Sequence, residues 1–199
     1  MVVQHNMAAS NANRQLGIST NTLSKSTEKL SSGYRINRAA DDAAGLSISE
    51  KMRSQIRGLN KASSNAQDGI SAIQTAEGAL NEAHSILQRM NELATQSAND
   101  TNTTADRTAV QSEVNALTNE LSRIASTSQF NTQNLLDGTF TGKNLQVGAL
   151  ENQKITISIG TMNAKALGVD SLNVKSFTKA GSAMTLIQKA ISKVSGQRS

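Results

Sequence analysis

The 199-residue sequence contains no cysteine and no proline, and its aromatic residues are limited to three phenylalanines and one tyrosine. The absence of cysteine excludes disulfides, thiolate metal sites and thiol nucleophiles. The absence of proline is expected of a chain whose helices run unbroken. Because bulky aromatic side chains are scarce, burial must come from Ala, Leu, Ile and Val in narrow seams, which favours long packed helices over a compact globule.

Net charge and hydropathy argue against two classes of partner, nucleic acids and the membrane interior. The formal net charge is +5, and the basic residues are scattered among polar and acidic ones without a dense Lys/Arg run. Such charges are typical of a solvated surface, so the sequence predicts no nucleic-acid partner. No apolar run reaches the roughly 18 residues of a membrane span, so no membrane insertion is predicted. Residues 1–13 lack the features of a cleavable secretory signal, so export would need another route.

A long amphipathic helix is predicted from about residue 42 to residue 98, with Asp41 or Asp42 as its N-cap. Apolar residues recur at intervals of seven in two rows offset by three, so both rows share one face of the helix. The first row is Met52, Leu59, Ala66, Ile73, Leu80, Leu87 and Ala94, and the second is Ala62, Gly69, Ala76, Ala83 and Met90. The small residues in these rows let neighbouring helix backbones approach closely.

The segment before this helix has a weaker pattern. Between Val3 and Ser32 the residues Ala9, Leu16, Leu23 and Leu30 recur at sevens, and Gly33 follows as a helix stop. The apolar stripe is one residue wide and Gly17 interrupts it. An isolated helix of this kind is marginal, so we expect it to be disordered until a partner packs against it.

In the remainder of the chain, the spacing of apolar residues changes from helical to alternating and then back to helical. A second helix is predicted at about 104–127, where Thr103 and Asp106 resemble a capping box and the seam is Val110, Val114, Leu117, Leu121 and Ile124. Alternating residues predict a β-hairpin region at about 135–160, followed by a loop over 161–176. A C-terminal helix is predicted at about 178–199, and since no stop signal precedes Ser199 the chain looks cut within that helix.

These patterns predict a mainly α protein, an elongated antiparallel helical bundle or coiled-coil rod with a small β-hairpin region at one end. Residues 1–40 would form an N-terminal helix and connector, and residues 41–199 a helical rod domain. The predicted rod core consists of Met52, Leu59, Ile73, Leu80, Leu87, Val114, Leu117, Leu121, Ile187 and Ile191.

No arrangement of residues indicates catalysis or cofactor binding. His5 and His84 lie far apart in the sequence, and adjacent Asp41 and Asp42 are explained by a helix N-terminus. None of the common metalloprotease, hydrolase or nucleotide-binding motifs is present. We therefore predict that the protein is not an enzyme and has neither a metal nor a cofactor.

Several motifs in order resemble bacterial flagellin. The strongest is LSSGYRINRAADDAAGLSIS at residues 30–49, followed by NAQDGIS at 65–71 and EGAL at 77–80. QRMNELATQ at 88–96, SQFN at 128–131 and AISKVSGQRS at 190–199 continue the match, the last resembling the start of the C-terminal half of the family. The resemblance therefore covers nearly the whole chain.

The resemblance implies a structural subunit of the flagellar filament, used in motility. Such a subunit would be exported unfolded by the flagellar type III apparatus, would be extracellular, and would polymerise with other flagellin subunits. Residues 3–32 would be the inner-core helix, with Ala9, Leu16, Leu23 and Leu30 as assembly residues. Flagellins continue beyond the position of Ser199 with the helices that complete the core, so we expect this 199-residue form to stay monomeric.

The resemblance also implies recognition by the vertebrate Toll-like receptor that senses flagella. The motif at 88–96 and the following helix assign the receptor contacts to Gln88, Arg89, Leu93, Gln96 and Glu113. Without the resemblance, these residues would be interpreted as ordinary surface charges and a leucine beside core Ala94. Two other functions remain open: a secreted, non-polymerising module that acts as a receptor ligand or adhesin, and a basic coiled-coil nucleic-acid binder. The lack of a clustered basic face disfavours the latter.

Overall fold

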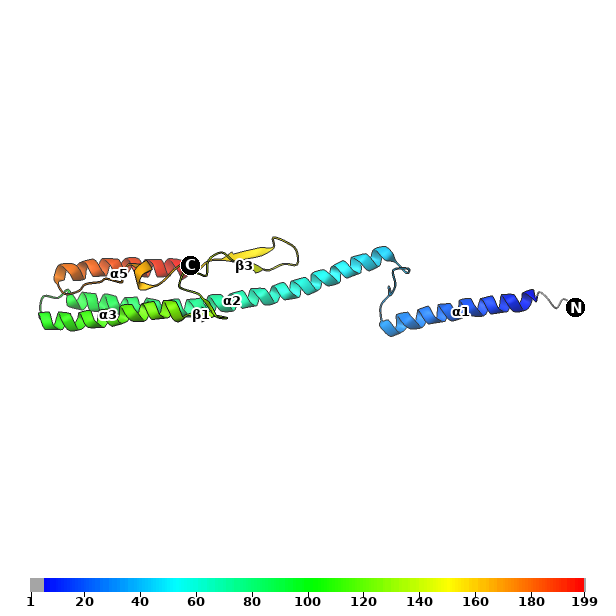
Figure 1. Cartoon of the computed structure of the whole chain (residues 1–199), viewed down its shortest axis with the longest axis horizontal. Coiled ribbons are helices and arrows are strands. Elements are labelled where there is room, and N and C mark those ends of the chain that lie inside the picture. Colours follow the sequence, from blue (N-terminus) through cyan, green and yellow to red (C-terminus); the bar gives the residue numbers. More distant parts are fainter. Residues whose placement is uncertain (1–5, 199) are drawn as a thin grey trace. The chain divides into compact units, whose positions relative to one another are not determined.

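The computed structural model describes residues 6–198 (Figure 1). The helices are α1 (Met7–Ser32), α2 (Ala43–Ser97), α3 (Thr104–Thr127), the one-turn α4 (Ala164–Leu167) and α5 (Phe177–Arg198). The mainly α class is confirmed, and α2, α3 and α5 lie within one or two residues of their predicted bounds. The chain divides into two compact units, Met1–Gly58 and Leu59–Ser199, and the division between them falls within α2.

In the first unit, α1 is a capped helix. The Asn6 side chain accepts a hydrogen bond from the backbone N–H of Ala9, and Gly33 ends the helix in the left-handed conformation at φ 71°. The predicted glycine stop is thus confirmed, whereas residues 3–5 of the predicted helix lie outside the described part of the chain. No residue of α1 is buried, and Leu30 is 90% exposed.

The connector between α1 and α2 is organised by its two adjacent aspartates. One carboxylate oxygen of Asp41 accepts hydrogen bonds from the backbone N–H groups of Asn37 and Arg38, which hold the pKa of Asp41 below its ordinary value. Asp42 accepts a 2.8 Å hydrogen bond from the backbone N–H of Gly45 and so caps α2. Of the two predicted N-caps, Asp42 is therefore the one observed.

In the second unit, α3 and α5 lie alongside the later part of α2 (Figure 1). Both run antiparallel to α2, because α3 returns from a short turn and α5 places Met184 beside Thr95 and Arg198 beside Glu77. The turn into α3 carries the predicted capping box between Thr103 and Asp106. The core between the helices includes Leu80, Leu87 and Met90 of α2, Val114 and Leu121 of α3, and Ala180, Ile187 and Val194 of α5.

The predicted rod core is correct only where α3 and α5 cover α2. The buried members are Leu80, Leu87, Val114, Leu121 and Ile187, while Leu117 and Ile191 are half-buried against the same core. Met52, Leu59 and Ile73 are 58%, 54% and 45% exposed, so their predicted burial is wrong for this chain. The heptad pattern marks a face that is able to pack, but α5 ends beside Glu77 and leaves the earlier turns of that face uncovered.

Two small antiparallel hairpins follow α3. β1 (Gln129–Phe130) pairs with β2 (Gln133–Asn134), and β3 (Lys143–Gln146) pairs with β4 (Lys154–Ile157) in a register that places Leu145 opposite Ile155. The second hairpin lies in the predicted β region, whereas the first was not predicted. The alternating isoleucines become buried progressively, from exposed Ile155 through half-buried Ile157 to buried Ile159.

The second hairpin packs on α2 beside a glycine. Leu145 of β3 lies against Gly69, where a Cβ atom would overlap the leucine side chain. The Asn65 side chain donates a 3.0 Å hydrogen bond to the backbone carbonyl of Gln146. A glycine in the helix therefore provides the space in which the hairpin is seated.

A buried polar clasp, formed by Ser97 and Gln111, holds the segment that leads into α5. The Ser97 hydroxyl donates to the carbonyl of Val174, and the Gln111 amide donates to the carbonyl of Leu172 at 2.9 Å. The Gln111 side-chain oxygen also accepts a 2.7 Å hydrogen bond from the backbone N–H of Val174. Both side chains are buried, so they satisfy backbone groups that water does not reach.

Candidate assembly and recognition surfaces

The leucine face of α1 is the first candidate assembly surface. Ala9, Leu16, Leu23 and Leu30 drift slowly around the helix at intervals of seven and so remain on one side of it. All four are exposed, and the segment is helical in the single chain, whereas we expected it to be disordered until a partner packs against it. A row of exposed leucines on a helix is a surface that another helix can cover.

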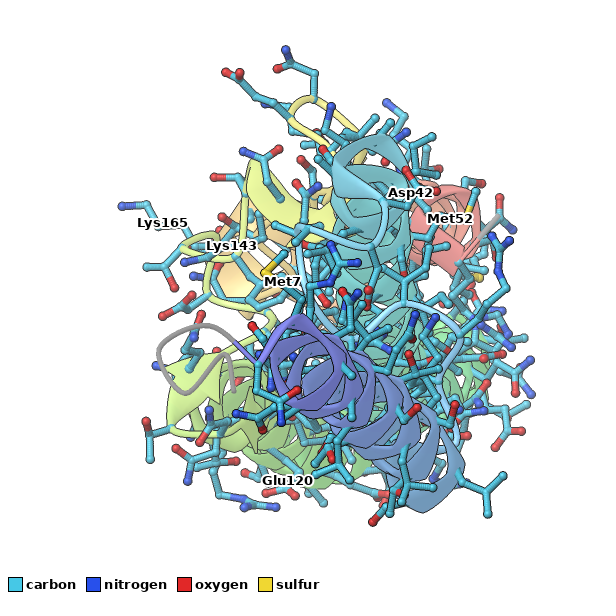
Figure 2. The ribbon with its side chains drawn as sticks, turned by 90° about the vertical axis from the view of Figure 1, so that its right-hand side faces the viewer. Met7, Asp42, Met52, Glu120, Lys143 and Lys165 are labelled. Atoms are coloured by element: carbon cyan, nitrogen blue, oxygen red, sulfur yellow. The ribbon has the colours of Figure 1, made fainter. Side chains whose placement is uncertain are left out.

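The uncovered face of α2 is the second candidate surface. It carries Ile48, Met52 and Ile56 in the first unit, and Leu59, Ile70 and Ile73 in the second. Met52 is labelled among the drawn side chains in Figure 2. Since each unit exposes three large apolar side chains on its part of α2, each set has the character of an interaction surface.

Arg89 and Glu113 form a charged pair that bridges α2 and α3. The guanidinium of Arg89 donates to one Glu113 oxygen at 2.9 and 3.1 Å, and to Glu92 at 3.1 Å. These carboxylates, Glu113 first, raise the pKa of Arg89 above its ordinary value. The helix packing thus brings together two predicted receptor contacts that are 24 residues apart.

The other predicted receptor contacts divide into exposed and buried residues. Gln88 and Gln96 are exposed on α2. Leu93 is 1% exposed and belongs to the helical core, so the prediction of a side-chain contact is wrong for this residue. The reason is that α2 is packed against both α3 and α5 at this level, which buries a wider stripe than one partner helix would.

The structure describes one of the two histidines that were considered for catalysis. His84 is half-buried with its Nε2 atom 3.1 Å from the Gln88 amide nitrogen, and His5 lies outside the described residues. Within residues 6–198 no group of three or more His, Asp or Glu side chains is arranged to hold a metal ion. In the same part of the chain, none of the helices combines the length and the apolar character needed to cross a membrane.

Two features near the hairpins and α5 were not predicted from the sequence. A hollow of about 240 Å³ opens between α2 and the strands, lined by Gly69, Ala72, Phe130, Phe140, Leu145 and Ile157 among others. Phe177, the first residue of α5, is 60% exposed. No local signal identifies either one, because the hollow depends on the seating of both hairpins and Phe177 fits a helical pattern.

Comparison with known proteins assigns the chain to a family. Residues 3–141 match the family described as bacterial flagellin N-terminal helical region. A flagellin of Clostridium tyrobutyricum is 68% identical over 142 residues, which are 71% of this chain and 38% of that protein. A flagellin of Halalkalibacterium halodurans is 52% identical over 201 residues, covering 100% of this chain and 74% of that protein.

Two further matches are a flagellar filament core protein and a solved flagellin structure. A flagellar filament core protein of Brachyspira hyodysenteriae is 47% identical over 214 residues, covering 100% of this chain and 75% of that protein. The crystal structure of Bacillus cereus flagellin superimposes with a TM-score of 0.57 at 32% identity, over 66% of this chain and 77% of that one. The chain therefore spans between about two fifths and three quarters of the length of these curated relatives.

Proposed function

Because the chain belongs to the bacterial flagellin family, we propose that it is a structural subunit of the extracellular flagellar filament. The observation that supports this best is 52% identity along the whole chain, together with apolar side chains on α1 and α2 that are exposed among residues 6–198. In a filament, helices of the assembled core would pack against the leucine face of α1 and the uncovered face of α2.

Burial of these faces supplies a driving force for assembly. Fully burying a leucine side chain is worth roughly 1.5–3 kcal/mol. Leu16, Leu23 and Leu30 would together contribute roughly 5–9 kcal/mol, from which the entropy of ordering α1 must be subtracted. The balance favours association only when several such contacts form together, which suits a polymer.

Export through the flagellar type III apparatus is part of the same proposal. The apparatus would have to pass the subunit unfolded, and a chain without cysteine carries no disulfide to be reduced first. The alanine-lined seams of α2 also make a modest core, with Ala76, Ala83 and Ala94 in place of larger side chains. A modest core has a modest free energy of unfolding.

Filament incorporation can be tested by mixing. The fluorescently labelled chain is added to Halalkalibacterium halodurans flagellin while that protein polymerises, and the pelleted filaments are assayed for label. We expect incorporation that falls at least tenfold in a Leu16→Ser, Leu23→Ser double variant. A Thr20→Ser, Thr22→Ser variant on the same helix serves as the matched control and should incorporate normally.

Two outcomes would contradict the proposal. Label that stays wholly in the supernatant would argue against a filament subunit, and equal incorporation of the leucine variant would argue against α1 as the assembly surface. Alone, the chain should remain monomeric, because two α1 leucine faces by themselves offer too few contacts to offset the entropy of ordering and association. Filaments of the chain by itself in negative-stain micrographs would refute that expectation.

We also propose that the flagellin-sensing Toll-like receptor recognises the surface around Arg89 and Glu113, with Gln88 and Gln96 beside them. Support comes from the ion pair, which fixes a charged arginine and an acceptor side by side at the surface. Preorganised charged groups give specificity at interfaces, and arginine is enriched among residues that dominate binding energy. Leu93 contributes only by packing beneath this surface.

Arg89→Ala tests this contact. We expect at least a tenfold weaker affinity for the receptor ectodomain and an unchanged unfolding midpoint, since exposed ion pairs add little stability. Arg123→Ala is the matched control, because Arg123 pairs with Glu120 on α3 in the same exposed manner. Unchanged affinity for the Arg89 variant would contradict the assignment.

A secreted, non-polymerising receptor ligand is the second candidate function. It is favoured by the exposure of the Arg89 and Glu113 side chains in the single chain, which needs no assembly to present them. Receptor binding by a chain that never enters filaments would identify this alternative. Incorporation into filaments would instead identify the structural subunit.

A further inference from the structure

Phe177 stands apart from the other aromatic residues of the second unit. Phe130 and Phe140 are half-buried against the core, whereas Phe177 is 60% exposed at the first residue of α5. Lys175 and Lys179, which flank it, are also exposed. The start of α5 therefore presents an apolar ring between two positive charges.

The hollow beside α2 has the complementary character. Its walls are mainly apolar, with Phe130, Phe140 and Ile157 on one side and Gly69 and Ala72 on the other. Its volume of about 240 Å³ exceeds the roughly 150 Å³ that is enough to hold a benzene ring. A phenylalanine side chain would therefore fit into it.

Phe177 cannot reach the hollow of its own chain. Since α5 places Met184 beside Thr95 and runs antiparallel to α2, Phe177 lies beyond the end of α2, close to the turn into α3. The hollow lies beside residues 68–72 of the same helix. At 1.5 Å per residue, about 25 residues of α2 separate the two features by roughly 40 Å.

We propose that Phe177 of one copy inserts into the hollow of the next copy, so that second units associate head to tail. This proposal rests on the filament function above and names one contact within it. The two surfaces differ, so the interface is heterologous, and each copy keeps a free Phe177 at one end and a free hollow at the other. Such a contact repeats without closing and generates a linear array.

The charges around the two surfaces are complementary. Asp68 on the rim of the hollow is exposed and would face Lys175 and Lys179 of the incoming copy. Lys143 lies on the same rim over the Phe140 ring. Asp100, in the turn near Phe177, is 82% exposed but already pairs with Arg107 at 3.0 Å, so the charge complementarity rests on Asp68 and the two lysines.

One inserted ring does not hold two proteins together by itself. Association costs translational and rotational freedom, and stable interfaces bury about 1,600 Å². The contact therefore forms in quantity only where other surfaces, such as the leucine face of α1, are engaged at the same time. This agrees with the expectation that the chain is monomeric in dilute solution and adds to a filament cooperatively.

Cysteine cross-linking tests the contact, and the native chain contributes no thiol of its own. One full-length variant carries Thr178→Cys at an exposed position beside the intact Phe177, and a second carries Gln133→Cys at an exposed position on the rim of the hollow. The two are mixed and oxidised with copper phenanthroline, and the disulfide-linked heterodimer is quantified. The control partner is Leu150→Cys, which is 57% exposed at the tip of the second hairpin.

We expect the heterodimer linked through residues 178 and 133 to form at least ten times faster than that linked through residues 178 and 150. Asp68→Lys in the second chain should slow the first linkage severalfold, and Lys175→Asp with Lys179→Asp in the first chain should restore it. Equal rates for the two pairs would overturn the proposal and leave another partner as the occupant of the hollow. Rapid linkage of residues 178 and 133 without filament incorporation would support this contact and reject the filament role. Filament incorporation with equal rates would support the filament role and reject this contact.

Discussion

Gly69 of α2 lies so close to Leu145 of β3 that a Cβ atom at residue 69 would overlap the Cδ1 atom of the leucine. The close approach places the second hairpin directly on the helix backbone. It also explains why a glycine occupies the middle of a helix, where alanine is favoured by about 1 kcal/mol.

Replacing this glycine should therefore differ from replacing another on the same helix. A Cβ atom added at Gly78 would meet no neighbour within 4 Å, so Gly78→Ala should raise the free energy of unfolding by about 1 kcal/mol. Gly69→Ala should lower it by about 1 kcal/mol, because the displaced Leu145 outweighs the gain in helix propensity. Urea denaturation of both variants measures the difference, and equal midpoints would show that the hairpin is not seated on Gly69.

The covered and uncovered parts of α2 give a second contrast. Leu87 is fully buried between the helices, whereas Leu59 lies on the exposed face of the same helix. Leu87→Ala should lower the free energy of unfolding by about 2–5 kcal/mol, because it leaves a cavity in the core. Leu59→Ala should change it by less than about 1 kcal/mol in the free chain. A large loss for Leu59→Ala would mean that another segment covers this face in solution.

The buried clasp gives a third prediction. Gln111→Leu would remove the partners of the Leu172 carbonyl and the Val174 N–H, leaving both unsatisfied away from water. Each such group costs about 1–3 kcal/mol, so the variant should lose about 2–6 kcal/mol of stability. Gln96→Leu, at an exposed position of α2, is the matched control and should be near neutral. A stable Gln111→Leu variant would show that the segment finds other partners.

The capping box predicts a dependence on pH. Hydrogen bonds from the Thr103 side chain and backbone hold the pKa of Asp106 below its ordinary value of 3.8. Because the folded state lowers this pKa, the stabilisation is present above the unfolded value and is lost as pH falls through the folded value. Wild type should exceed Asp106→Asn in urea midpoint at neutral pH, and the gap should narrow below about pH 4. A gap that does not change with pH would contradict this role.

The helical framework could be predicted from the sequence because its determinants are local. The 4-3 spacing of Val110, Val114 and Leu117 and the pairing of Thr103 with Asp106 place α3 correctly. Gly33 and Asp42 mark the ends of the connector in the same way. These signals depend on neighbours within one or two turns, so no tertiary information is needed.

Features that depend on a partner segment could not be predicted in this way. Leu59 and Leu87 occupy equivalent heptad positions, and Leu87 is buried because both α3 and α5 pack against that part of α2. β1 and β2 are two residues each, and Asn131 and Thr132 in their turn have φ values of 46° and 62°. Because neither residue is a glycine, the sequence gives no signal for this turn. Gln111 has the polar character of a surface residue and becomes interior only because the segment before α5 crosses it.

The recognition surfaces show the same limit. The family resemblance predicts receptor contacts at Arg89 and Glu113, and helix packing places these two side chains together. It also predicts a contact at Leu93, whose side chain is buried by the packing of α3 and α5. A motif along one helix does not give the direction in which each of its side chains points.

The clasp of Ser97 and Gln111 has a mechanical consequence for the start of α5. The Ser97 and Gln111 side chains hold the carbonyl and the N–H group of Val174. Val174 lies only three residues before Phe177, so the position of the Phe177 ring is coupled to α2 and α3. Any strain that pulls the end of α2 away from α3 would be transmitted to the direction in which that ring projects. In the proposed head-to-tail contact, bending of α2 relative to α3 would change the angle between consecutive copies.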